Sequence, residues 1–168
     1  MLVAGGCKET PKTVVAKESG SCDGVPEISF DPAIADPAKL LDSGNYETVL
    51  AAQTRVLLAH EGHQLPVIIL PSLNRQDIAI VSDCLGNRWE REGKIDGDDL
   101  LILLAPKERR VRIATGNKSR ADLPDAEAAK IIEKMTKIFA DSRYSSNRYG
   151  HGIATGIRAI QNHMDGRQ

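Results

Sequence analysis

The sequence predicts an α/β domain in which helices cover a small mixed sheet. Two short runs, residues 65–70 and 100–105, are apolar at every position, which is typical of strands buried on both faces. A helical pattern lies between them, and further helical patterns precede and follow them. The length of 168 residues suits one such domain with a real core and a short tail.

The first segment, residues 1–30, predicts a flexible tether, because it is rich in Lys, Glu, Ser, Gly and Thr and has no apolar period. Its start, MLVAGGC, places small residues directly before Cys7, as at the end of a bacterial lipoprotein signal, where the cysteine is lipidated. A basic start and a long apolar stretch are absent, so the match is either a trimmed signal or chance. A lipidated Cys7 would anchor the domain, residues 31–166, in a periplasmic or other cell-envelope compartment.

The folded part is expected to begin with an extended lead-in, residues 30–45. Two Asp-Pro steps in this lead-in disfavour helix, since the residue before a proline avoids the helical region. Asn45 can cap a helix, and valine and alanine recur at helical spacing from there to a stop near Gly62. The apolar strand at 65–70 follows this first helix.

A second helix is predicted next, with Trp89 on its apolar face and a stop at Gly93. The strand at 100–105 follows, and a turn links it to a strand at 109–114. There arginine alternates with valine and isoleucine, which indicates a half-exposed strand at or near an edge. Asp125 is predicted to cap a third helix, and a last helix carries three isoleucines at helical spacing.

Composition and charge argue against several classes of protein. The 22 basic and 23 acidic residues nearly cancel, so the chain lacks the basic surface that binds nucleic acid. Fully apolar stretches reach only about six residues, too few to span a bilayer. Three cysteines, Cys7, Cys22 and Cys84, are too few and too scattered for a disulfide scaffold. Cys84 is expected to be a small buried hydrophobe, and the chain a monomer.

Chain direction gathers acidic residues at one end of the predicted sheet. A crossover helix joins the strands at 65–70 and 100–105, which should therefore be parallel, whereas the strand at 109–114 should run antiparallel after its tight turn. The start of the second strand and the end of the third then meet, beside the end of the first helix. The oxygen-bearing side chains expected there are Glu61, Asp96, Asp98, Asp99, Asn117, Asp122 and Asp125.

Such a cluster suits a hard cation, calcium or magnesium, because these ions take oxygen ligands. The predicted ligands are Asp98, Asp99, Asp125, Glu61 and Asn117. Two plainer explanations stay open, since acidic residues before a strand often lie in a solvated loop, and Asp125 can serve as a helix cap. The sequence contains no serine–histidine–acid signature, P-loop or dinucleotide-binding glycine pattern.

The order and spacing of several stretches resemble the TPM domain family over roughly residues 30–164. The stretches that carry the resemblance are ADPAKLL, LPVIILPSL, LGNRWEREGKIDGDD, LLILLAPKERRVRIATG, LPDAEAAKII and IFADSRYSSNRYGHGIATGIRAI. This family includes a plant thylakoid-lumen acid phosphatase, a cyanobacterial photosystem II repair protein, bacterial membrane-tethered proteins and an animal modulator of acetylcholine receptors. The resemblance implies an α/β/α sandwich, with helices on both faces of the sheet and an acidic site at one sheet end.

By this resemblance, Asp98 and Asp99 match the family's acidic pair before the central strand. Asp125 matches the acidic residue that opens the next helix, and Asp36 matches one in the lead-in. The chain departs from the family at Leu100, where a glycine usually follows the pair, and at NKSR, where an aromatic residue and a second glycine usually follow RIATG. Leucine does not let the backbone approach a ligand closely, so we expect a reshaped site with reduced or lost activity.

Two functions follow from the acidic cluster and the resemblance. The first is an accessory or regulatory module that binds calcium or magnesium, touches the membrane only through its N-terminal anchor and acts on a membrane protein complex. The second is a divalent-metal-dependent phosphomonoesterase, in which the ion polarises the phosphoryl oxygens and Asp99 is the candidate catalytic residue. No lysine, arginine or histidine can be assigned to the transferring phosphate, which favours the first. A structural module without a ligand is the third alternative.

Overall fold

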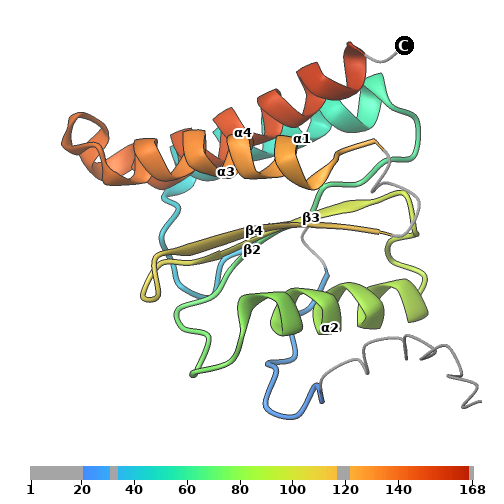
Figure 1. Cartoon of the computed structure of the whole chain (residues 1–168). Helices are drawn as coiled ribbons and strands as arrows, with labels where there is room; N and C mark the ends of the chain where they lie inside the picture. Colours follow the sequence, from blue (N-terminus) through green and yellow to red (C-terminus); the bar gives the residue numbers. More distant parts are fainter. Residues whose placement is uncertain (1–20, 31–33, 117–121, 167–168) are drawn as a thin grey trace, which may run out of the picture.

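Three layers make up the fold, as the α/β/α prediction requires (Figure 1). A four-stranded sheet lies in the middle, with α2 on one face and the other long helices on the opposite face. The computed structural model describes residues 21–30, 34–116 and 122–166. The helices are α1 (Ser43–Ala59), α2 (Ile78–Arg91), α3 (Asp125–Ala140) and α4 (Arg148–Asp165), with a short 3-10 helix, η2 (Ser142–Asn147), before α4.

The strands stand in chain order across the sheet. Their bounds are β1 (Ile34–Ala35), β2 (Val67–Ile69), β3 (Leu100–Ala105) and β4 (Arg110–Thr115). β1, β2 and β3 run parallel, and β4 pairs antiparallel with β3 at the sheet edge. The predicted mixed sheet is therefore confirmed. β1 was not predicted as a strand; it is two residues of the expected extended lead-in, which pair with β2.

Two separate hydrophobic cores explain why β3 is apolar throughout. Successive side chains of a strand point to opposite faces of the sheet. Ile102 and Leu104 belong to the core under α1, α3 and α4, whereas Leu101 and Leu103 belong to the core against α2. All six β3 residues are buried. A strand covered on both faces has no position left for a polar residue.

The helix caps differ from the prediction at two positions. α1 begins at Ser43, and the side chain of Asp42 caps it by accepting the N–H of Asn45 at 2.8 Å. Asn45, the expected cap, is instead buried inside the helix. Asp125 is likewise the first residue of α3, after Pro124, which makes no side-chain cap. Asp125 still lies in the first turn of α3, where a negative charge is favourable to the helix dipole.

The packed chain begins earlier than the expected boundary at residue 31. Cys22 forms a disulfide with Cys84 of α2, and Val25 is buried in the core on that side. The expectation that Cys84 is only a buried hydrophobe is therefore wrong, because a partner 62 residues away leaves no local spacing pattern. Residues 1–20, including the predicted lipidation site Cys7, lie outside the described residues. No helix in the described ranges is long and apolar enough to cross a membrane.

Candidate functional site

The loop before β3 is folded on its own carboxylates. The N–H of Asp98 donates to Oδ1 of Asp96 at 2.9 Å, and the N–H of Asp96 donates to Oδ2 of Asp99 at 2.8 Å. The N–H of Asp99 also donates to the Asp96 carbonyl at 3.1 Å. We call residues 96–99 the DGDD loop. The carboxylates of Asp96 and Asp99 thus organise the backbone of the loop that leads into β3.

Two other segments meet the DGDD loop, as chain direction predicts. Gln64, just after α1, donates its N–H to Oδ1 of Asp99 at 2.6 Å. Nδ1 of His63 lies 3.2 Å from the carbonyl oxygen of Asp98. Gly116, directly after β4, donates its N–H to the carbonyl of Asp99 at 3.2 Å. Asp99 is therefore the residue through which these three segments are joined.

Burial sets the electrostatics of Asp99, which is only 5% exposed. Desolvation raises the pKa of its carboxyl above the ordinary value, outweighing the N–H groups of Gln64 and Asp96 that hydrogen-bond to the charged form. The charge of Asp96 adds to the rise, and His63 opposes it. The ionised carboxylate is thus held at an energetic disadvantage, which a nearby cation would relieve.

The raised pKa predicts a pH-dependent difference in stability between wild type and Asp99→Asn. The folded state binds the Asp99 proton more tightly than the unfolded state does. Its contribution to the free energy of unfolding is therefore fully present below the ordinary value of 3.8 and is lost as pH rises through the raised folded pKa. Wild type should lose stability relative to Asp99→Asn across that window, measured by urea unfolding at a series of pH values.

Glu108 provides a control, because its pKa is shifted in the direction opposite to that of Asp99. Desolvation works against its charge, but hydrogen bonds from the Ser72 hydroxyl and the Leu73 N–H lower its pKa overall. Wild type should therefore gain stability relative to Glu108→Gln as pH rises through the acidic range. A pH profile of Asp99→Asn that runs parallel to wild type would contradict the role given to burial.

The remaining predicted ligands are not gathered into one cluster. Glu61 and Asp125 are exposed, and neither lines the pocket beside Asp99. Within residues 21–30, 34–116 and 122–166, no group of three or more His, Cys, Asp or Glu side chains is arranged to hold a metal ion. Asn117 lies outside the described residues. Asp98 adjoins Asp99 in the DGDD loop but, like Glu61 and Asp125, does not line the pocket, so the five-residue ligand set stays a prediction.

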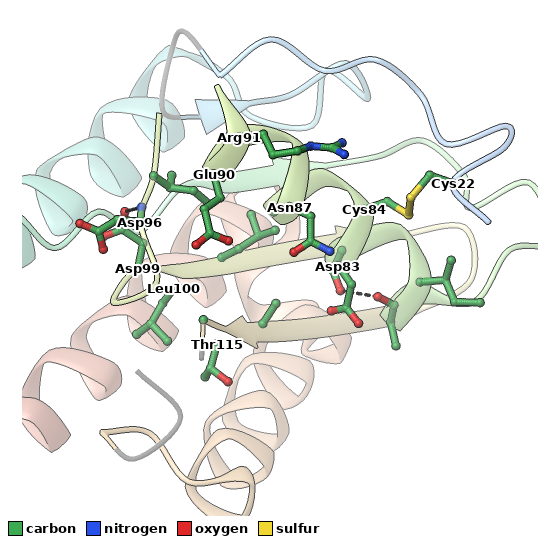
Figure 2. A pocket seen from close by; sticks show the side chains of 18 of the residues that line it. Cys22, Asp83, Cys84, Asn87, Glu90, Arg91, Asp96, Asp99, Leu100 and Thr115 are labelled. Atoms are coloured by element: carbon green, nitrogen blue, oxygen red, sulfur yellow. Dashed lines mark hydrogen bonds between the residues drawn. A yellow bond between two sulfur atoms is a disulfide. The ribbon is translucent and has the colours of Figure 1, made fainter. Parts of the chain in front are cut away.

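A pocket of about 700 Å³ runs along α2 from the disulfide to the DGDD loop, and Figure 2 shows its lining. Carboxylates dominate its charged side chains. The acidic residues that line it are Asp77, Asp83, Glu90, Asp96 and Asp99. Arg91 is the one basic residue among the described residues that line it. Figure 2 shows Asp96 and Asp99 at the end of the pocket away from the disulfide, with Glu90 on the neighbouring part of α2.

This charge balance favours a cation over an unaccompanied phosphate ester. Carboxylates repel an anionic substrate, and a metal-dependent phosphatase would need its ion in place before the ester could approach. Calcium takes carboxylate, carbonyl and water oxygens, and magnesium keeps several waters and needs one or two carboxylates. The DGDD loop offers those donors, although the described residues form no all-protein cage.

Sequence reasoning missed the contribution of α2 to this pocket. Asp83 and Glu90 are seven residues apart on α2, and both line the pocket. Residues at that spacing lie on the same helix face two turns apart, so the signal was present in the sequence. What could not be read there is that this face lies beside the DGDD loop, because helix rotation is decided by packing against the sheet.

Comparison with known proteins identifies the fold independently. The sequence profile of the TPM domain matches residues 34–163. The chain is similar to the solution NMR structure of the N-terminal domain of a protein from P. gingivalis, with 26% identity and a TM-score of 0.66, over 80% of this chain and 83% of that one.

A second solution structure is also similar. It is the N-terminal domain of the cg2496 protein from Corynebacterium glutamicum, with 20% identity and a TM-score of 0.57, over 89% of this chain and 86% of that one. At this identity the likeness shows the fold alone. None of the curated proteins compared with the chain matches it.

Proposed function

Because the chain belongs to the TPM domain family, we propose that it is an extracytoplasmic accessory module that binds calcium or magnesium beside the DGDD loop. The observation that carries this proposal is the pocket at that loop, lined by five acidic residues and one basic residue among those described. Asp99, buried at the end of this pocket with a raised pKa, is a carboxylate whose charged form a neighbouring positive charge would stabilise.

The ligands we propose are the carboxylates of the DGDD loop, with carbonyl and water oxygens completing the shell. Asp98 and Asp99 come from the original prediction, and Asp96 joins them because its backbone and carboxylate are hydrogen-bonded to both. Both oxygens of Asp99 already accept backbone N–H groups, so the ion would take their remaining lone pairs. A coordination shell with few carboxylates and several waters predicts weak binding, with a Kd on the order of millimolar.

The disulfide supports a location outside the cytoplasm. Cys22 and Cys84 are linked, and disulfides persist in oxidising compartments but are rare in the reducing cytosol. Lipidation of Cys7 would add an anchor at the start of the chain. In this arrangement the domain would act by contact on a membrane protein complex.

The test is a thermal melt with calcium, with magnesium and with chelator. A ligand that binds only the folded state stabilises it by about 2.7 kcal/mol at a hundred times its Kd, so the melting temperature should rise by several degrees in saturating cation. Asp99→Asn should abolish the rise, and Asp98→Asn should reduce it. Melting temperatures that do not respond to either ion at tens of millimolar would end the proposal.

Two matched variants locate the site more finely. Asp125→Asn and Glu61→Gln each remove one exposed carboxylate that belongs to the predicted ligand set but not to the pocket. If the ion binds beside the DGDD loop alone, both variants should keep the full calcium response. Loss of the response in Asp125→Asn would mean that Asp125 is a ligand, as the five-residue set predicted from the sequence requires.

A further inference from the structure

The segment before β1 lies across α2 and covers its tryptophan. We call residues 22–30 the strap. The indole Nε1 of Trp89 donates to the carbonyl of Ile28 at 3.1 Å, and the ring of Phe30 packs edge-on to the indole at 5.1 Å between centroids. Trp89 is only 1% exposed, so the strap completes its burial.

The strap is held by a small number of non-covalent contacts before Ile28. Val25 is the one strap residue buried in the core, at 7% exposure. Gln76 donates through Nε2 to the carbonyl of Asp23 at 2.7 Å, and Arg88 donates to the carbonyl of Pro26 at 3.2 Å. Each of these bonds contributes only modestly to holding the strap, because water competes for the same groups.

A covalent bond adds to these contacts at the first strap residue. The disulfide joins Cys22 to Cys84 of α2, with 5.7 Å between their Cα atoms. Cys84 is 5% exposed, whereas Cys22 is exposed to solvent. Figure 2 shows the disulfide at the opposite end of the pocket from Asp96 and Asp99. The bond is therefore reachable from solvent on one side only.

We propose that the strap is a redox-controlled cover. While the disulfide is intact, the strap is clamped over α2 and Trp89 is buried. A dithiol reductant, such as the reduced form of a thiol–disulfide oxidoreductase, releases the clamp and lets the strap detach from the Cys22 end. The proposal does not depend on cation binding, because it rests on the disulfide and the contacts of the strap alone.

The reaction is a two-electron thiol–disulfide exchange. A thiolate of the dithiol attacks Sγ of Cys22, the exposed residue of the pair, the disulfide bond breaks, and Cys84 leaves as a thiolate that takes up a proton. The second thiolate of the dithiol attacks the mixed disulfide and expels Cys22, which is protonated in turn. The protein gains two electrons and two protons, and the dithiol becomes a cyclic disulfide.

Trp89 provides the readout, because it is the one tryptophan in the sequence. A Cys7→Ser background removes the third cysteine, so native protein should show no free thiol before treatment with dithiothreitol and two afterwards. We expect reduction to shift the Trp89 emission to the red, as the indole meets water, and reoxidation to reverse the shift.

Cleavage by a glutamate-specific protease gives a second, independent readout. Glu27 lies in the strap and should be cut several-fold faster after reduction, whereas Glu92, at the end of α2, serves as the internal control and should be cut at an unchanged rate. Val25→Ser, which weakens the non-covalent hold but keeps the disulfide, should open fully at a lower dithiol concentration than wild type.

Two outcomes would contradict the proposal that the strap is a redox-controlled cover. The first is the appearance of two thiols with no change in emission or in cleavage after Glu27, which would mean that the strap stays docked without the disulfide. The second is that millimolar dithiothreitol does not reduce the disulfide in the native protein, which would mean that the bond has a structural role only. Since both measurements keep Cys22 and Cys84, neither depends on a variant that lacks the disulfide.

Discussion

Trp89→Ala is expected to lower the free energy of unfolding by about 3–5 kcal/mol, the range for truncating a large buried aromatic residue. The side chain is 1% exposed and lies between the sheet and the strap. Its removal leaves a cavity in the core against α2, the Ile28 carbonyl loses its indole donor, and Phe30 loses its ring partner. Urea unfolding followed by circular dichroism measures the loss.

Two controls separate packing from hydrogen bonding. Trp89→Phe keeps an aromatic ring but removes the indole N–H, so it should lose less stability than the alanine variant. Leu58→Ala removes a large side chain that is 77% exposed and should change stability by less than about 0.5 kcal/mol. A Trp89→Ala variant as stable as Leu58→Ala would mean that the α2 core contributes little to the fold.

Gly116→Ala is expected to lower the free energy of unfolding by about 1–3 kcal/mol, the usual effect of overpacking. A Cβ at this position would lie 2.2 Å from the carbonyl oxygen of Gly97 and 2.7 Å from its carbon. These are backbone atoms of the DGDD loop, which cannot move aside as a flexible side chain could. The hydrogen bond from the Gly116 N–H to the Asp99 carbonyl should weaken as the two segments separate.

Gly86→Ala is the matched control for this steric argument. Gly86 lies inside α2, and a Cβ there would meet nothing within 4 Å. Alanine reduces the conformational freedom of the unfolded chain, so this variant should be more stable than wild type by about 0.4–1 kcal/mol. The calcium response links the first variant to function, because Gly116→Ala should weaken it, whereas Gly86→Ala serves as a control for stability alone. Equal stability of the two variants would refute close packing at Gly116.

The candidate site was predictable only in part. Chain direction placed Asp99 next to the segments after α1 and β4, and the hydrogen bonds of Gln64 and Gly116 to Asp99 bear this out. Strand direction alone decides which segment ends meet. The same argument predicted Asp125 and Glu61 as neighbours of Asp99, but neither lines the pocket. Segments that meet at one end of a sheet can still point their side chains in different directions.

The pairing of Cys22 with Cys84 shows what local patterns hide. The two residues are 62 positions apart, and one of them fell in a segment whose composition predicted a tether. Composition measures how much apolar surface a segment can bury by itself. It does not measure what the segment can bury against a completed helix, where Val25 and Phe30 find partners that exist only after folding.

The amino-acid sequence by itself determined the α/β class, the order of the helices and strands after the lead-in, and the fully buried β3 strand. These features depend on hydrophobic periodicity and on the limited ways in which parallel strands can be connected. Only the tertiary structure decided the two-residue β1, the Cys22–Cys84 disulfide, and the α2 face that brings Asp83 and Glu90 to the pocket. Each of these depends on contacts between distant segments, whose geometry is set by side-chain packing that no local pattern encodes.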